Sequence, residues 1–182
     1  MEKINELFIK QANFKKLIGT FIITILYKFF VIDKMIANFT ELTKGAKLLD
    51  FYAGLKSNQA YEIISSYGDR AIKYYNLIQL ADMILPALMG LTYVAGISLL
   101  IQQVYNGQKY KFLSTIPLFT VALFDYIENI GIAVMLRKFP GSLSGIAEVT
   151  GFFTTIKMAS YGLSILIIVV LLIKWIVKRV RK

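Results

Sequence analysis

The stretch FLSTIPLFTVALFDYIENIGIAVML, residues 112–136, indicates both the fold class and the place of the functional side chains. It is longer than the ~20 residues that an α-helix needs to cross the hydrocarbon core of a bilayer. Yet it contains the polar side chains of Asp125, Glu128 and Asn129. Because an ionised group facing lipid costs ~2.5–3.5 kcal/mol near mid-membrane, these side chains should face other helices of the same protein.

Further apolar blocks of similar length occupy residues 17–39, 78–104 and 151–177. The whole chain of 182 residues is 57% hydrophobic and 14% aromatic, above the composition of most soluble domains. We therefore predict an all-α integral membrane protein, a bundle of four transmembrane helices that forms a single domain over residues 1–182. The lipid bilayer is its predicted partner, and a multi-pass protein of the cell membrane is the predicted localisation.

Residues 40–77, between the first two blocks, predict a short helical cap. Ser57 is a helix-starting residue, Gly68 a helix-ending one, and Asp69 a second start that leads into the next block. The apolar face of the first cap helix should lie on the membrane surface or over the mouth of the bundle; it consists of Ala60, Ile63 and Ile64.

The distribution of basic residues predicts the orientation in the membrane. With four spans, the N-terminus, the turn at 105–111 and the C-terminus share one side, which carries more Lys and Arg than the segments 40–77 and 137–150 on the other side. The tail KWIVKRVRK, residues 174–182, contributes most to this difference. Since basic loops remain in the cytoplasm, both termini should be cytoplasmic.

The composition also excludes several chemistries. The sequence contains no cysteine and no histidine, so it offers no disulfide, no thiolate or imidazole metal ligand and no cysteine nucleophile. We expect no metal site and no cofactor. The net charge of +10 lies largely beside the predicted spans, where anionic lipid headgroups rather than nucleic acid would meet it.

Asp125, Glu128 and Asn129 follow the i, i+3, i+4 spacing of one helix face. The predicted topology and a rise of ~1.5 Å per residue place Asp82 and Lys157 in the same half of the membrane, beneath the cap. We therefore predict a capped intramembrane pocket with eight candidate residues: Asp82, Asp125, Glu128, Asn129, Lys157, Arg70, Tyr93 and Tyr161.

The charges of this predicted pocket do not cancel. Its acids outnumber its lysines by two when Asp33 and Lys28 of the first block are included. The excess could be met by protonation, by Arg70 or Lys73 of the cap, or by a bound cation. The simpler alternative is a buried salt bridge of Lys157 with Glu128 or Asp82 that only fixes helix packing.

Several short motifs resemble a family of uncharacterised bacterial membrane proteins with four spans. They are the cap residues Ala60, Tyr61, Gly68, Arg70 and Tyr74, the spacing from Asp82 to Pro86, FDYIEN at 124–129, and FTTIK at 153–157. The resemblance covers the last two thirds of the chain, and it departs at Gly54-Leu55-Lys56-Ser57, where the family has a Gly-Tyr-Ser-Pro-like sequence. It implies a shared polar site and no particular substrate.

Three functions are compatible with these features. The first is transport or binding of a cation, a proton or a small polar solute, which would require a homodimer because four spans are few for alternating access. The second is an intramembrane enzyme that uses Glu128 or Asp125 as general acid or base on a lipid-like substrate. The third is an assembly or accessory protein whose charges lock the bundle.

Overall fold

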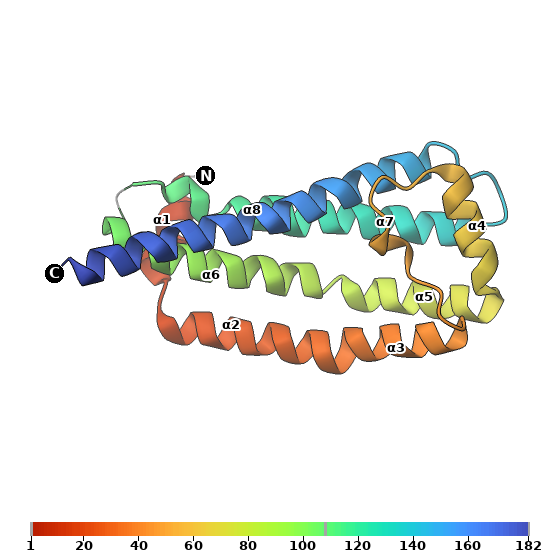
Figure 1. Ribbon diagram of the computed structural model, residues 1–182, viewed down its shortest axis with the longest axis horizontal. Helices are drawn as coiled ribbons and strands as arrows, with labels where there is room; N and C mark the ends of the chain where they lie inside the picture. The colour runs from red at the N-terminus through yellow and green to blue at the C-terminus, as the bar shows by residue number, and fades with distance from the viewer. Residues whose placement is uncertain (1, 108, 182) are drawn as a thin grey trace. The chain divides into compact units, whose positions relative to one another are not determined.

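In the computed structural model, residues 2–107 and 109–181 are described, and all of their regular secondary structure is helical (Figure 1). This confirms the predicted all-α fold class. The chain forms two compact units. Unit 1 comprises Met1–Ile25, Ala87–Leu123 and Met158–Lys182, and unit 2 comprises Leu26–Pro86 and Phe124–Lys157.

Unit 1 contains α1 (Glu2–Gln11), most of α2 (Phe14–Tyr27), most of α6 (Leu85–Tyr105) and the C-terminal part of α8 (Ile146–Val180). Its buried apolar core is small and consists of Ile9, Ile97, Ile101 and Leu171. Helix α8 contributes residues to both units, so the predicted single domain stays a prediction.

Polar and close contacts join the helices of unit 1. The hydroxyls of Thr24 on α2 and Thr92 on α6 lie 2.9 Å apart.

The predicted turn at 105–111 includes Gln108, which lies outside the described residues. Before it, Asn106 and Gly107 take the left-handed conformation, with φ of 52° and 70°, and end α6.

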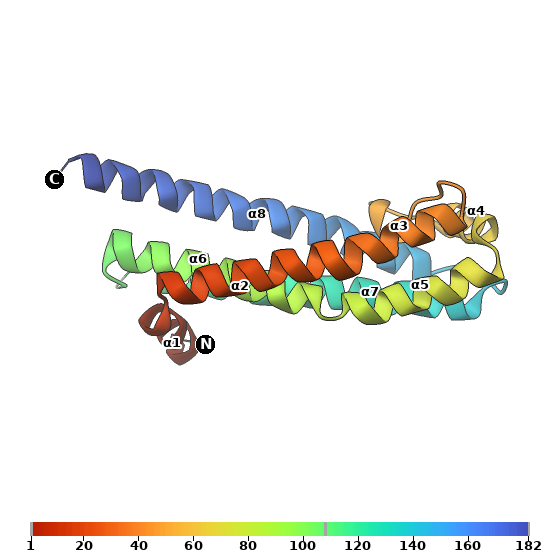
Figure 2. The ribbon, with the colours of Figure 1, turned by 90° about the horizontal axis from the view of Figure 1, so that it is seen from below.

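Unit 2 contains α3 (Asp33–Leu42), α4 (Ser57–Tyr67), α5 (Asp69–Asp82), most of α7 (Leu123–Lys138) and the start of α8. Helices α3 and α5 run side by side in both views (Figures 1 and 2). The core of unit 2 gathers side chains from all of these helices and from the segment between α3 and α4, among them Phe39, Leu48, Leu55, Ile64, Tyr75, Ile132, Met135 and Ala147.

The cap helices begin and end where the sequence predicts. Helix α4 starts at Ser57, and Gly68, with φ of 75°, separates it from α5. The apolar face of α4 does not lie on a surface, because Ala60 and Ile64 are fully buried in the core of unit 2. The cap is therefore part of the packed structure of its unit.

Tyrosine hydroxyls hold the segments of the cap together. The Tyr67 hydroxyl donates to the Lys47 carbonyl at 2.6 Å, and the buried Tyr75 hydroxyl donates to Asp50 Oδ1 at 3.0 Å. Burial, followed by the nearby Asp50 carboxylate, raises the pKa of Tyr67 well above its ordinary value. The phenol therefore remains a neutral donor throughout the physiological range.

Prolines interrupt the helices that follow the cap. Helix α5 ends at Asp82 and α6 begins at Leu85, since Pro86 cannot donate an N–H to the preceding turn. Pro117 likewise precedes a π-helix, Leu118–Ala122, which leads into α7. Both prolines lie inside segments that the sequence predicts as spans.

Three segments, rather than the predicted four, are long and apolar enough to cross a membrane: Asp69–Tyr105, Lys111–Lys138 and Ile146–Val180. The remaining block, 17–39, lies in a continuous helical stretch from Phe14 to Leu42 that includes the π-helix Lys28–Ile32. This block differs from the other three in its charge, and the fourth span stays a prediction: every 18 residues of the stretch hold at least three charged side chains, which come from Lys15, Lys16, Lys28, Asp33, Lys34 and Glu41.

Candidate functional site

A cluster of polar side chains joins α7 to the start of α8 in unit 2. Lys157 Nζ forms an ion pair with Glu128 Oε2 and lies 3.7 Å from Asp125 Oδ1. The Thr154 hydroxyl, one helical turn before Lys157, donates to the other oxygen of Glu128 at 2.7 Å. The helical spacing predicted from FDYIEN thus places Asp125 and Glu128 toward one partner, Lys157.

This cluster is closed to the surface. The side chain of Glu128 is fully buried, Asp125 is 4% exposed, and the side chain of Lys157 is 12% exposed. Charged groups are tolerated at such burial only when each is paired or hydrogen-bonded. Lys157 meets this requirement for both carboxylates, because it contacts Glu128 and lies 3.7 Å from Asp125.

Asp82 on α5 joins the cluster through an amide. Asn129 Nδ2 donates to Asp82 Oδ2 at 3.0 Å. The amide of Asn129 is fully buried, and within the described part of the chain its Oδ1 accepts no hydrogen bond. The cluster consequently ends on one side at the half-buried carboxyl of Asp82, which accepts a hydrogen bond from a neutral amide.

Close packing of small residues allows α7 and α8 to approach at the cluster. A Cβ added to Gly131 of α7 would collide with the hydroxyl of Thr150 on α8. A Cβ added to Gly151 would meet the backbone of Leu55, and the Gly151 carbonyl accepts a hydrogen bond from the Gly54 N–H at 3.1 Å. Gly131 thus permits the close approach of α7 to α8, and Gly151 permits that of the segment at Leu55 to α8.

Lys28 and Asp33 do not belong to the cluster. They form an ion pair of 2.7 Å with each other, and their side chains are 49% and 41% exposed. The charge balance of the cluster is therefore set by three carboxyls, Asp82, Asp125 and Glu128, against the single ammonium of Lys157.

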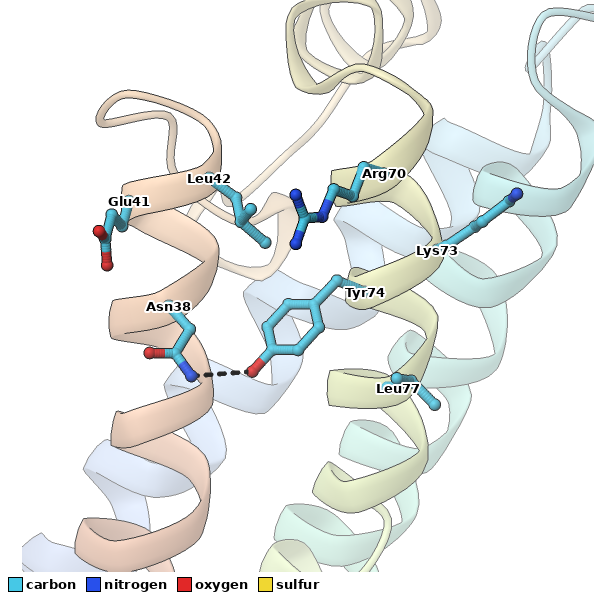
Figure 3. Close-up of a pocket in the computed structure, with 7 residues that line it drawn as sticks. All are labelled: Asn38, Glu41, Leu42, Arg70, Lys73, Tyr74 and Leu77. Atoms are coloured by element: carbon cyan, nitrogen blue, oxygen red, sulfur yellow. Dashed lines mark hydrogen bonds between the residues drawn. The ribbon is translucent and has the colours of Figure 1, made fainter.

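Arg70 lies in a different part of unit 2 from the predicted pocket. It is exposed and points into a groove of about 730 Å³ between α3 and α5, where Tyr74 accepts a hydrogen bond from Asn38 at 3.3 Å (Figure 3). Lys73 and Glu41 also line this groove. The sequence analysis placed Arg70 at the pocket as a residue of the cap, but its side chain on α5 points into this groove instead.

Tyr93 and Tyr161 belong to unit 1, whereas the cluster belongs to unit 2. Their ring centroids lie 6.2 Å apart, and the Tyr161 hydroxyl donates to the sulfur of Met89 at 3.6 Å. Of the eight candidate residues, the structure thus brings five together: Asp82, Asp125, Glu128, Asn129 and Lys157. Thr154 also belongs to the cluster, because its hydroxyl donates to Glu128. Its i, i+3 spacing from Lys157 in the sequence indicates that the two side chains share one helix face.

Comparison with known proteins found no matching protein family, no matching curated protein and no matching solved structure. The resemblance to bacterial four-span membrane proteins therefore stays a prediction. No group of three or more Asp and Glu side chains within residues 2–107 and 109–181 is arranged to hold a metal ion. The chemistry open to the cluster is that of carboxyls, an amide and an ammonium.

Proposed function

We propose that the protein is an integral membrane protein whose buried carboxyl and lysine cluster binds a proton. The observation that supports this most directly is the excess of carboxyls: Glu128 and Asp125 lie near Lys157, and Asp82 adds a third carboxyl beside a neutral amide. Full ionisation would leave two negative charges uncompensated at low dielectric. A proton removes one of them and, unlike a larger cation, needs no additional space.

Exposed apolar helix surface supports the membrane part of this proposal. Only 17% of the most apolar window of α8 is buried, although its mean hydropathy is 2.4. Soluble proteins rarely expose contiguous apolar surface of this extent. On α2, the side chains of Phe14, Ile18, Phe21, Ile22 and Ile23 are exposed in the same way.

We further propose that the helical stretch Phe14–Leu42 is a fourth crossing, which keeps both termini in the cytoplasm. The ion pair between Lys28 and Asp33 supports this, because pairing lowers the cost of placing two of its charges near lipid. A fourth crossing puts the two termini on the same side, and three crossings put them on opposite sides.

Single cysteines should report this topology, since the chain has no cysteine of its own. In the variants Glu2→Cys and Arg181→Cys, we expect protection from an impermeant thiol reagent added outside intact cells, and in Lys47→Cys we expect labelling. Labelling of only one terminal variant would contradict the fourth crossing. Labelling of both terminal variants would preserve it and reverse the orientation.

The proton should reside on Asp82, because Glu128 and Asp125 have the ammonium of Lys157 within 4 Å and Asp82 has an amide. Infrared spectroscopy separates the carbonyl band of a protonated carboxylic acid from that of a carboxylate. At neutral pH we expect such a band in the detergent-solubilised protein and its loss in Asp82→Asn, which preserves the shape of the side chain.

The control for this measurement is Glu41→Gln, which removes an exposed carboxyl and should leave the band unchanged. A wild-type protein without the band would contradict proton binding. A band that survives in Asp82→Asn and disappears in Asp125→Asn would move the proton to Asp125 and leave the proposed function intact.

A second candidate function, in assembly, is favoured by the ion pair between Lys157 and Glu128. A closed pair of this kind fixes the register of α7 against α8 whatever else the protein does. The enzyme alternative gains no support, because a lipid-like substrate would have to reach Glu128 or Asp125, which are both buried. Transport of a cation or small polar solute by a homodimer stays a prediction.

A further inference from the structure

An apolar trough of about 630 Å³ runs along unit 1, lined by side chains of α2, α6 and α8. Most of its lining is aliphatic or aromatic: Phe14, Leu17, Phe21, Tyr93, Leu99, Leu100, Ile168, Leu172 and Trp175. A volume of this size accommodates a long hydrocarbon chain or part of one. Tyr93, a candidate residue from the sequence, contributes to this trough rather than to the polar cluster.

Gly96 of α6 keeps the trough open. A Cβ at this position would lie 3.6 Å from Leu17 Cδ1 and 3.9 Å from Ile168 Cδ1, which is ordinary packing distance. Any side chain larger than alanine would therefore extend into the trough. Glycine costs helix stability relative to alanine, so its presence in the middle of α6 is explained by the space that it leaves.

One end of the trough opens into a polar cup of about 400 Å³. The trough and the cup share three lining residues, Gln103, Trp175 and Arg179. The cup adds Gln102, Asn106 and Lys178, and among the described residues that line either cavity there is no Asp or Glu. The combined site is thus apolar along its length and polar and basic at one end.

The basic groups of the cup are held in place by the end of α6 and by Trp175 of α8. Lys178 Nζ donates to the carbonyls of Gln103 and Val104 at 2.9 and 2.8 Å. The guanidinium of Arg179 lies 5.4 Å from the ring of Trp175. Tryptophan and arginine are residues that favour the level of lipid headgroups, where apolar and polar surroundings meet.

We propose that the trough and the cup together bind one anionic phospholipid of the bilayer. Its acyl chain lies in the trough over Gly96, and its phosphate lies in the cup against Arg179 and the amide groups of Gln102 and Asn106. Charge complementarity selects an anionic lipid, because a zwitterionic headgroup would bring its own cation toward Arg179 and Lys178. The proposal is independent of proton binding at the Lys157 cluster.

Trp175 provides a direct test, because it is the only tryptophan in the chain and lines both cavities. We would titrate the delipidated protein in detergent with phosphatidylglycerol or phosphatidylcholine carrying brominated acyl chains, which quench tryptophan fluorescence on contact. We expect saturable quenching at about fivefold lower concentration for phosphatidylglycerol, the ratio that corresponds to one favourable contact with a basic side chain.

Two pairs of variants distinguish lipid binding at a defined site from nonspecific attraction of anionic lipid to the basic tail. Arg179→Gln should abolish the preference for phosphatidylglycerol, whereas Arg181→Gln, with the same loss of charge outside both cavities, should retain it. Gly96→Leu should remove saturable quenching, whereas Gly162→Leu, where nothing lies within 4 Å of an added Cβ, should retain it.

Equal titration curves for the two lipids would overturn the proposal. So would an equal loss of preference in Arg179→Gln and Arg181→Gln, because diffuse attraction to the basic tail would then explain the binding. Arg179 is exposed, so its variant should fold. The headgroup comparison therefore remains decisive even if Gly96→Leu does not fold.

Discussion

Replacement of Glu128 by glutamine should lower the free energy of unfolding by about 3–5 kcal/mol, the usual cost of breaking a buried ion pair. Glutamine preserves the shape and accepts the hydrogen bond from Thr154, but it leaves the ammonium of Lys157 without its contacting carboxylate. The remaining carboxylate, Asp125, is 3.7 Å away. Chemical denaturation in detergent micelles, followed by circular dichroism, measures the loss.

The double variant Glu128→Gln with Lys157→Met distinguishes a structural pair from a functional carboxyl. If the pair is structural, methionine removes the stranded charge and restores much of the lost stability, so the two changes are strongly non-additive. Glu41→Gln, at an exposed carboxyl, is the matched control and should be near neutral. Unchanged stability in Glu128→Gln would refute the structural role and return Glu128 to the candidates for proton binding.

Replacement of Gly151 by alanine should destabilise the protein by several kcal/mol, although it adds only one methyl group. The new Cβ would collide with the backbone N–H and carbonyl of Leu55, which cannot rotate away as a side chain can. The hydrogen bond from the Gly54 N–H to the Gly151 carbonyl would be displaced with it. The same denaturation measurement should show this loss.

Gly162→Ala in the same helix is the matched control. An added Cβ there has no neighbour within 4 Å, so the higher helix propensity of alanine should stabilise the protein by up to about 1 kcal/mol. A lower free energy of unfolding in Gly151→Ala and a higher one in Gly162→Ala would show that contact with the segment at Leu55, and not helix propensity, determines the effect at Gly151. A loss of stability at both positions would contradict this explanation.

The sequence alone predicted the features that depend on helix periodicity or on a few neighbouring residues, such as a shared helix face and the ends of a helix. The i, i+3, i+4 spacing of Asp125, Glu128 and Asn129 fixes their common face, and this holds in any α-helix. Ser57 and Gly68 likewise predicted the bounds of α4, since helix ends depend on a few neighbouring residues. The sequence also contains the feature that distinguishes residues 14–42 from the other three stretches, namely at least three charged side chains in every 18 residues.

Only the tertiary structure decided which side chains meet across the chain. Arg70 was predicted to meet the pocket because it belongs to the cap, but position along a helix gives no direction around its axis, and α5 turns this side chain into the groove beside α3. The choice of Glu128 as the contacting partner of Lys157 depends on how closely α7 and α8 approach, which Gly131 permits. The trough over Gly96 arises from three helices distant in sequence, and no local pattern in any one of them encodes a space between all three.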